Sequence, residues 1–435
     1  MRHTWALALI AFLLAVGAIV FVLFALGIGP FGTAEESAGP ESPGDSRSPG
    51  TSQPPGTSQP QDPSESEDAP EASESPEATE PPEDQTLSWG PTSADLEQAE
   101  AAVAEMSDAE LAGQVLISHW SGTEPEAAAK LVADYHLAGL VFMGPNIETA
   151  AQLQEVTGAV QNQQQAAGRE WPAIISVDQE GGRVARLRGV IDKVPAFATL
   201  AAQGNAEVRA VTEAMGAQMA DLGFTMDFAP VADVSIGPKD PTIGDRAAGT
   251  DPEFVADAAL AAVAGLLEGG VVPTVKHFPG HGSVTTDSHI DLPVQKRSLE
   301  ELREKDLVPF AAAISAGAPV VMMAHVSVEE LDPGVPATLS APAYALLRDE
   351  LGFEGVIVTD AMNMQAITKT TKSGQESVAA LAAGADLVLM PADIKAAHGA
   401  IVAALDSGDL DRSELERSAA RVVALQLWFD AGLAE

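Results

Sequence analysis

The chain has 435 residues, enough for two average domains or for one large α/β barrel with additional segments. Its 63 acidic side chains against 23 basic ones exclude a nucleic-acid partner, because phosphates require a basic surface. The absence of cysteine excludes disulfides, thiolate metal sites and cysteine nucleophiles.

Residues 1–32 contain a candidate membrane anchor. An uncharged apolar run extends from residue 6 to residue 28 and is long enough to span a hydrocarbon core about 30 Å thick. Arg2 precedes the run and an acidic tract follows it, which predicts an inside N-terminus and an outside body. Cleavage near Gly29 would instead release the protein. We therefore predict a single-pass membrane protein with its folded part outside the membrane, or a secreted protein if the segment is cut.

Residues 33–88 have the composition of a disordered linker. Pro, Ser, Gly, Thr and acidic residues dominate, and almost no apolar side chains are present to build a core. We expect an extended tether that holds the folded part away from the membrane. The folded domain is therefore expected to cover residues 89–435, beginning near Trp89.

After residue 90, short apolar runs alternate with alanine-rich amphipathic stretches such as 149–167 and 253–270. Continuous apolar strands separated by helices indicate a parallel sheet that is buried on both faces. Eight such units predict an α/β fold, a (β/α)8 TIM-type barrel. An open doubly wound sheet is the alternative, although no G-x-G-x-x-G follows any strand. The expected strands are 114–118, 139–143, 173–177, 225–231, 272–275, 320–324, 355–359 and 386–390.

Polar side chains follow five of the eight expected strands. Functional groups in a barrel of this kind lie directly after the strand C-termini. Helix capping explains one such residue but not five sets of them. These sets begin at Asp178, Asp233, Lys276, His325 and Asp360.

The segment 273–293, PTVKHFPGHGSVTTDSHIDLP, concentrates the most reactive groups. It holds three of the eight histidines, on a strand ending at Lys276-His277 and on the loop that follows. Loops that gather titratable groups at strand ends are where catalytic sites are usually built. This segment indicates an enzyme.

A zinc site is an alternative interpretation of the same segment. Its ligands would be His277, His281, Asp287 and His289. The spacing lacks the helical H-E-x-x-H pattern of metallohydrolases. We therefore expect no metal ion at this segment. We also expect that the protein needs no cofactor and that it is a monomer.

Three sequence blocks occur in a distinctive order between about residues 107 and 390. They are DQEGGRVARL, KHFPGHG followed by DSH, and LRDELGFEGVIVTDAMNM. Together they resemble the β-N-acetylhexosaminidases of glycoside hydrolase family three. The resemblance implies the same (β/α)8 barrel and a retaining exo-glycosidase acting on terminal β-linked N-acetylglucosamine. It also implies a small carbohydrate substrate, typically a peptidoglycan-derived fragment.

The resemblance assigns roles to individual positions. Asp360 in VTDAM matches the nucleophile, His289 in DSH matches the general acid/base, and Asp287 matches the carboxylate that pairs with this histidine. These residue types suit glycoside cleavage with retention, because a carboxylate can form a glycosyl ester and an imidazole can give and then remove a proton. The positions that match sugar-binding residues are Asp178, Arg186, Arg246, Lys276 and His277.

Two positions depart from the family pattern. Ser283 stands where aspartate often follows PGHG, and Ala247-Ala248 replace the usual Ser-Phe after Arg246. Neither removes a catalytic group, but the second bears on local contacts with the sugar.

Several functions stay open at this point. A histidine acid/base is neutral when it acts as a base, so phosphate can compete with water and give a phosphorylase. Another β-glycosidase specificity is a further alternative. A surface protein that binds sugar without turnover is the alternative from another class, although it should have lost one of Asp287, His289 and Asp360, and all three are present.

Overall fold

A computed structural model describes residues 85–237, 240 and 242–433 of the chain. The predicted anchor, and all but the last four residues of the predicted linker, lie outside the described residues. Within the described part, no helix is both long and apolar enough to cross a membrane.

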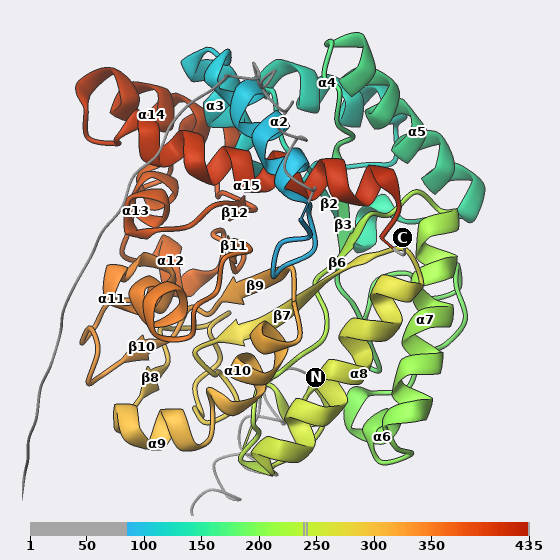
Figure 1. Ribbon diagram of the computed structural model, residues 1–435, viewed down its shortest axis with the longest axis vertical. Coiled ribbons are helices and arrows are strands. Elements are labelled where there is room, and N and C mark those ends of the chain that lie inside the picture. Colours follow the sequence, from blue (N-terminus) through green and yellow to red (C-terminus); the bar gives the residue numbers. More distant parts are fainter. Residues whose placement is uncertain (1–84, 238–239, 241, 434–435) are drawn as a thin grey trace, which may run out of the picture. The chain divides into compact units, whose positions relative to one another are not determined.

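The core of the described domain is one eight-stranded parallel sheet that curls into a nearly closed barrel (Figure 1). The strand order is β11-β9-β7-β6-β3-β2-β1-β12, and a parallel bridge between Val358 and Leu387 joins the two ends. This arrangement agrees with the predicted (β/α)8 barrel rather than an open doubly wound sheet. The strands are β1 (Leu116–Ser118), β2 (Gly139–Phe142), β3 (Ile174–Val177), β6 (Met226–Asp227), β7 (Val272–Phe278), β9 (Val320–Met323), β11 (Val356–Thr359) and β12 (Val388–Leu389).

Helices surround the sheet and bury its outer face (Figure 1). Their starts follow the usual capping rules: Thr92, Ser107 and Ser298 each form a capping box, and Asp251 caps a helix that opens with proline. The α-helices are α2 (Ser93–Ala104), α3 (Asp108–Gln114), α4 (Pro125–Tyr135), α5 (Ala150–Ala166), α6 (Phe197–Ala201), α7 (Asn205–Asp221), α8 (Pro252–Glu268), α9 (Leu299–Glu304), α10 (Val308–Ser315), α11 (Ala341–Ala345), α12 (Gln365–Thr368), α13 (Gln375–Ala383), α14 (Ile394–Ser407) and α15 (Arg412–Ala431).

Short elements decorate the strand ends. β4 (Gln179–Gly181) and β5 (Val184–Ala185) pair antiparallel, and β8 (Val294–Gln295) pairs in parallel with β10 (Ser327–Val328). Single helical turns lie at η1 (Gly144–Asn146), η3 (Gly244–Arg246), η4 (Ala337–Leu339) and η5 (Leu346–Glu350).

The barrel strands are fully buried and largely apolar, as the continuous apolar runs predict. Every residue of β1, β2, β3, β9 and β11 is buried. Phe142 stacks edge-on against Trp120 at 4.7 Å and Phe224 at 5.0 Å between ring centroids, an arrangement that aromatic pairs favour. This packing holds the strand ends in fixed positions.

Four strands differ from the prediction by two or more residues. The expected strands 114–118 and 386–390 are shortened to Leu116–Ser118 and Val388–Leu389. The expected strand 225–231 is reduced to Met226–Asp227, and Pro230 cannot donate to a sheet ladder. The expected strand 272–275 continues to Phe278, so Lys276 and His277 lie on the strand itself. The predicted helices 149–167 and 253–270 agree with α5 and α8 to within two residues.

Candidate active site

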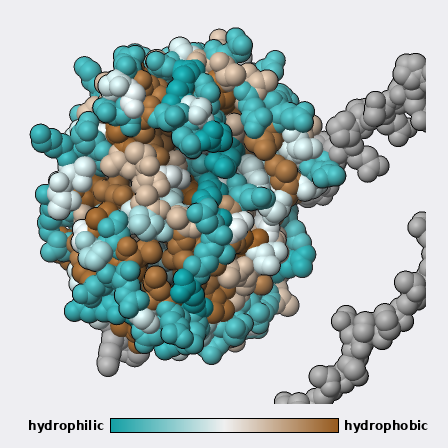
Figure 2. Space-filling model, turned by 60° about the vertical axis from the view of Figure 1, so that its left-hand side comes forward, coloured by the Kyte–Doolittle hydropathy of each residue, from teal (hydrophilic) through white to brown (hydrophobic). Residues whose placement is uncertain are grey.

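The predicted site residues lie around the C-terminal ends of the strands. Asp178 follows β3, Lys276 and His277 end β7, and Asp360 follows β11. In Figure 1 the arrowheads of β7 and β9 point toward the side where α12, β8 and β10 lie. That side comes forward in Figure 2, where hydrophobic residues gather in the middle of the face and hydrophilic residues surround them. Parallel strands thus bring residues from distant parts of the chain to one rim.

A buried cluster of four charges lies at this rim. The Lys276 Nζ is 2.8 Å from Asp178 Oδ1 and 2.7 Å from Glu180 Oε1. Arg246 donates to both oxygens of Glu180, through Nη2 at 2.7 Å and Nε at 2.8 Å. The side chains of Lys276 and Glu180 are only 2% and 3% exposed. Two cations and two anions therefore fix one another, with Lys276 and Glu180 removed from bulk water and Arg246 and Asp178 partly exposed.

The electrostatics of the cluster favour the charged forms of Glu180, Lys276 and Arg246. Burial raises the pKa of Glu180, but Lys276 and Arg246 outweigh it and hold that pKa well below the usual range of a glutamate. Burial lowers the pKa of Lys276, but Asp178 and Glu180 outweigh it and raise the pKa above its ordinary value. The cluster can thus present fixed N–H donors and carboxylate acceptors to a polar ligand.

Asp227 lies near this cluster and behaves differently. Its Oδ1 accepts from the Gln179 backbone N–H at 2.8 Å, whereas its Oδ2 has no hydrogen-bond partner among the described residues. Burial is the main reason why the pKa of Asp227 is raised to about 8. Burial thus favours the protonated form of Asp227 over a wider pH range than for an ordinary aspartate.

His277 is held by a second buried carboxylate. Its Nδ1 is 2.7 Å from Asp233 Oδ2, and Asp233 is completely buried. Burial raises the pKa of Asp233, but His277 outweighs it by charge and hydrogen bonding, so the pKa is lowered. The Arg246 Nη2 lies 3.4 Å from the other ring nitrogen, Nε2. This pattern favours the tautomer in which Nδ1 carries the proton.

Asp360 is an ionised carboxylate at the end of β11. Its Oδ1 accepts from the Ala361 backbone N–H at 2.7 Å. Burial raises the pKa of Asp360, but His325, His277 and the Ala361 N–H outweigh it and lower the pKa below its ordinary value. A charged oxygen is what nucleophilic attack requires.

His325 is completely buried beside Asp360. Its Nε2 is 3.0 Å from the Ala361 carbonyl oxygen, and its Nδ1 contacts the Thr338 hydroxyl. Burial is the main reason why the pKa of His325 is lowered; Asp360 acts in the opposite direction, while His277 and His289 add to the lowering. His325 is thereby tied through the Ala361 carbonyl to the residue that follows Asp360.

The Asp287–His289 pair forms on the loop after β7. The His289 Nδ1 and backbone N lie 2.8 Å and 2.9 Å from the same Asp287 oxygen. The His289 side chain is 66% exposed, whereas Ser288 between the two is buried and bonds His281 Nε2 at 3.1 Å. The Ser288 carbonyl accepts from the Ala366 N–H at 3.3 Å. The loop is thereby joined to the segment that follows Asp360.

Arg186 is the least engaged of the predicted site residues. Its backbone N–H donates to the Asp178 carbonyl at 3.2 Å, so it lies beside the charged cluster. Its buried Nε has no hydrogen-bond partner within the described part of the chain. A buried donor without a partner is costly, and a ligand hydroxyl would satisfy it.

Three further residues complete the site; Asp233 and His325 were expected at the strand ends, but none of the three had a predicted individual role. Glu180 holds two cations, Asp233 orients His277, and His325 bonds the carbonyl of Ala361, the residue after Asp360. Each follows a barrel strand closely, so strand position marks them as rim residues. Their partners could not be read from spacing, because Glu180 and Arg246 are 66 residues apart.

The four candidate zinc ligands do not converge. His277 bonds Asp233, His281 bonds Ser288, and His289 bonds Asp287. Over the ranges that the structure describes, no group of three or more His, Asp or Glu residues is arranged to hold a metal ion.

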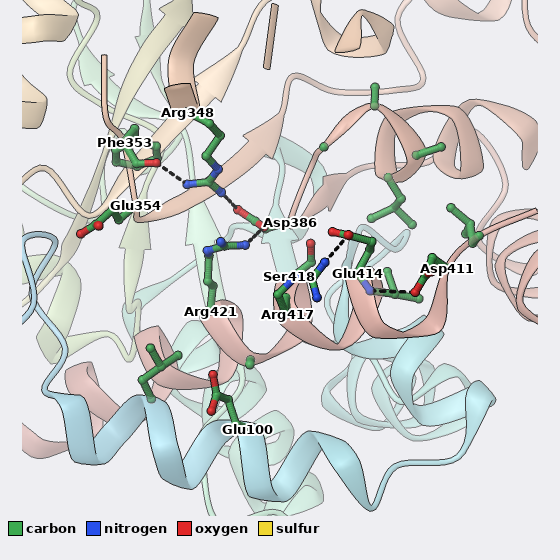
Figure 3. Close-up of a pocket in the computed structure, with 18 of the residues that line it drawn as sticks. Glu100, Arg348, Phe353, Glu354, Asp386, Asp411, Glu414, Arg417, Ser418 and Arg421 are labelled. Atoms are coloured by element: carbon green, nitrogen blue, oxygen red, sulfur yellow. Dashed lines mark hydrogen bonds and ion pairs between the residues drawn. The ribbon is translucent and has the colours of Figure 1, made fainter. Parts of the chain in front are cut away.

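A separate cavity of about 870 Å³ lies at the opposite end of the barrel (Figure 3). Arg348 and Arg421 converge there on Asp386, which precedes β12, and Arg348 also donates to the carbonyl oxygens of Phe353 and Gly355. None of the predicted site residues lines this cavity. The buried pairing of Asp386 therefore belongs to the closure of the barrel.

The barrel and the titratable side chains at its strand ends place this chain among barrel proteins whose strand ends carry groups suited to acid–base chemistry. The chain belongs to glycosyl hydrolase family 3, because residues 100–425 match the N-terminal domain of that family. It is 36% identical over 309 residues to the β-hexosaminidase LpqI of Mycobacterium tuberculosis, covering 69% of this chain and 78% of that protein. It is 33% identical over 331 residues to β-hexosaminidase A of Pseudoalteromonas piscicida, covering 70% of this chain but only 55% of that longer protein.

Solved structures show the same likeness. A family 3 β-N-acetylglucosaminidase from Paenibacillus is 36% identical with a TM-score of 0.72, and the match covers 75% of this chain and 63% of that one. The structure of M. tuberculosis LpqI is 33% identical with a TM-score of 0.68, covering 75% of this chain and 96% of that one. The family resemblance predicted from the three sequence blocks is confirmed.

Proposed function

We propose that the protein is a retaining exo-β-N-acetylglucosaminidase that uses Asp360 as nucleophile and His289 as acid/base. This proposal rests on one observation: the segment that follows Asp360 and the loop with His289 are hydrogen-bonded to each other at the same rim. Asp360 is an ionised strand-end carboxylate, and the Asp287–His289 pair is bonded to the segment that follows it. The names of the similar proteins, β-hexosaminidase and β-N-acetylglucosaminidase, support the same activity.

The reaction then proceeds in two steps. Asp360 attacks the anomeric carbon while His289 donates a proton to the leaving oxygen, which gives a glycosyl ester and frees the aglycone. His289, now neutral, removes a proton from water, and the water oxygen displaces Asp360 with retention. Asp287 holds the Nδ1 proton and stabilises the imidazolium form, so that Nε2 carries the transferred proton.

The charged cluster would hold the terminal sugar. Lys276 and Arg246 keep N–H groups beyond those that their carboxylate partners use, because an ammonium has three donors and a guanidinium five. Asp178 can accept from a sugar hydroxyl, and the Arg186 Nε is an unsatisfied donor beside it. His277, fixed by Asp233, offers its Nε2 to a hydroxyl donor.

Peptidoglycan-derived fragments are the substrates that we propose. The apolar run at 6–28 and the linker that follows support an enzyme displayed outside the cell membrane, where such fragments arise. Incubation with defined muropeptide fragments and with β-linked N-acetyl disaccharides, followed by product analysis, tests this choice. Release of N-acetylglucosamine from the disaccharides alone would contradict it.

The activity itself is tested with a chromogenic β-N-acetylglucosaminide. We expect wild-type turnover with β-N-acetylglucosamine as the first product, observed by NMR, and loss of turnover in Asp360→Ala. If the wild-type protein and Asp360→Ala were equally inactive while the protein still bound the sugar, the alternative of a binding protein would replace the enzyme.

Phosphorolysis is the second candidate. A histidine acid/base favours it, because the neutral base repels an anionic acceptor less than a glutamate would, and His289 is largely exposed. Incubation in phosphate buffer should then yield N-acetylglucosamine 1-phosphate. Finding free sugar alone at saturating phosphate would leave hydrolysis as the reaction.

A further inference from the structure

Both stems of the loop that carries Asp287 and His289 return to one buried carboxylate. Asp306 lies between α9 and α10 and is completely buried. Its Oδ1 accepts from the Ser283 hydroxyl at 2.9 Å, at the start of the loop. Its Oδ2 pairs with the guanidinium of Arg297, beyond the end of the loop.

Gln295 and Gly280 tighten the same junction. The Gln295 Nε2 donates to the Ser283 hydroxyl, and its Oε1 accepts from the Arg297 backbone N–H at 3.0 Å. Gly280 has a φ of +123°, and a Cβ there would lie 2.7 Å from the Asp306 Cβ. We call Ser283, Gln295, Arg297 and Asp306 the loop clasp.

The tip of the loop is exposed while its stems are held. Asp287 and His289 are 34% and 66% exposed, so little packing holds them in place. Val284 is buried in a small cluster with Ala324 and Val326, and the end of the loop pairs through β8 with β10. Further contacts join Ser288 to His281 and Ala366, and Lys369 to Ile290 and Asp291. The clasp fixes the separation of the two stems and so contributes, with these contacts, to where the acid/base lies. A catalytic group displaced by about 1 Å can lose roughly 100-fold in rate.

We propose that Asp306 is a positioning residue for the acid/base, acting through the loop clasp. This inference rests on the proposed function. A hydroxyl at position 283 suits the role because it donates to Asp306, whereas a carboxylate there would face another carboxylate at the same distance. Because Asp306 is buried, removing either of its partners should destabilise the junction strongly, since a buried carboxylate that loses a partner is strongly destabilised.

Leaving-group dependence distinguishes positioning from general damage. Departure of dinitrophenolate needs no proton, whereas departure of phenolate relies on the general acid. In Asp306→Asn and Ser283→Ala of the full-length protein, we expect kcat/KM for the phenyl β-N-acetylglucosaminide to fall roughly 10- to 100-fold. For the dinitrophenyl glycoside, kcat/KM should fall no more than about 3-fold, because sugar binding and Asp360 are unchanged.

Asp386→Asn is the matched control. Asp386 is likewise a buried aspartate paired with arginines, but it lies at the opposite end of the barrel (Figure 3). It should lower thermal stability without changing the ratio of the two kcat/KM values. Equal losses on both substrates in Asp306→Asn, or a changed ratio in the control, would overturn the inference.

Hydrogen–deuterium exchange gives a readout that does not depend on turnover. Residues 284–294 should exchange faster in Asp306→Asn than in wild type, while the barrel strands remain protected. If Asp306→Asn fails to fold, Ser283→Ala and Arg297→Gln replace it, and unchanged exchange in both would refute the clasp. If the wild-type protein cleaves neither glycoside, the proposed function fails, whereas the exchange result still decides whether the clasp orders the loop.

Discussion

Replacing Glu180 by glutamine should destabilise the protein strongly, because Glu180 neutralises two buried cations. Its carboxylate accepts from Lys276 at 2.7 Å and from Arg246 at 2.7 and 2.8 Å. Glutamine keeps one oxygen acceptor but places an NH₂ group against a guanidinium. Breaking a buried pair by neutralising one member costs about 3–5 kcal/mol of the free energy of unfolding.

The loss should also depend on pH in a definite direction. The folded-state pKa of Glu180 is depressed, chiefly because Lys276 and Arg246 outweigh the effect of burial. Its stabilising contribution is therefore fully present above the pKa of an unfolded glutamate, about 4.3, and fades as the pH falls further toward the folded-state pKa. Wild type and Glu180→Gln should differ by a constant amount from pH 8 to about pH 5 and converge in more acid solution.

Equilibrium urea unfolding of the full-length protein at several pH values measures both quantities. Asp245→Asn is the control, because the Arg183–Asp245 pair lies at the same rim but both side chains are about half exposed. Such an exposed pair contributes at most about 1 kcal/mol. A loss below about 1 kcal/mol in Glu180→Gln, or a loss that does not vary with pH, would refute the account of the charged cluster.

Three further predictions concern neighbouring carboxylates. Wild type should lose stability as the pH rises from about 4 to 8, because burial raises the folded-state pKa of Asp227 to about 8 and the unfolded chain releases the proton first. Asp227→Asn should remove this loss. Urea unfolding across this pH range measures the free energy of unfolding of both proteins, and parallel pH profiles would contradict the prediction. Asp233→Asn should lower kcat/KM roughly 10- to 100-fold, because an amide can hold the wrong tautomer of His277, and steady-state kinetics with a matched circular dichroism spectrum tests this. Burial raises the pKa of Asp360, but His325 and His277 outweigh it and lower the pKa, so loss of the ionised nucleophile should not reduce kcat/KM until the pH falls below about 3.9; an acid limb of the wild-type kcat/KM profile centred well above that pH would contradict this.

The sequence predicted the barrel well because burial on both faces leaves a strong local signal. Eight apolar runs between helices gave eight parallel strands, and the rule of strand ends found Asp178, Lys276, His277 and Asp360. Strand lengths were less predictable. The run at 225–231 is mostly apolar, but its regular ladder covers only Met226–Asp227; Pro230 interrupts the pairing before an isolated bridge between Val231 and Lys276, and hydropathy does not record the missing N–H.

Pairing between distant residues was beyond the reach of the sequence. Arg246 was expected among the sugar-binding residues, and in the structure both carboxylate oxygens of Glu180 engage it. The role of Asp306 gave no local signal, because its partners Ser283 and Arg297 belong to a loop that becomes adjacent only after folding. Contacts of this kind depend on tertiary structure, which neither periodicity nor local propensity encodes.

Asp233 links the two halves of the proposed chemistry mechanically. One Asp233 oxygen lies within hydrogen-bond distance of His277 Nδ1, and the other accepts from the backbone N–H of His281. The side chain of His281 in turn bonds Ser288, which lies between Asp287 and His289. A residue of the sugar site and the stem of the acid/base loop thus share one buried carboxylate. A bound sugar that moves His277 would also move the loop, because both contact Asp233. A substitution of Asp233 should therefore change sugar binding and the position of His289 together. The Ser288–Ala366 bond adds the nucleophile's segment to the same connection. The proposed nucleophile, sugar site and proton donor are therefore joined to one another by backbone and buried carboxylates, although the imidazole of His289 stays exposed.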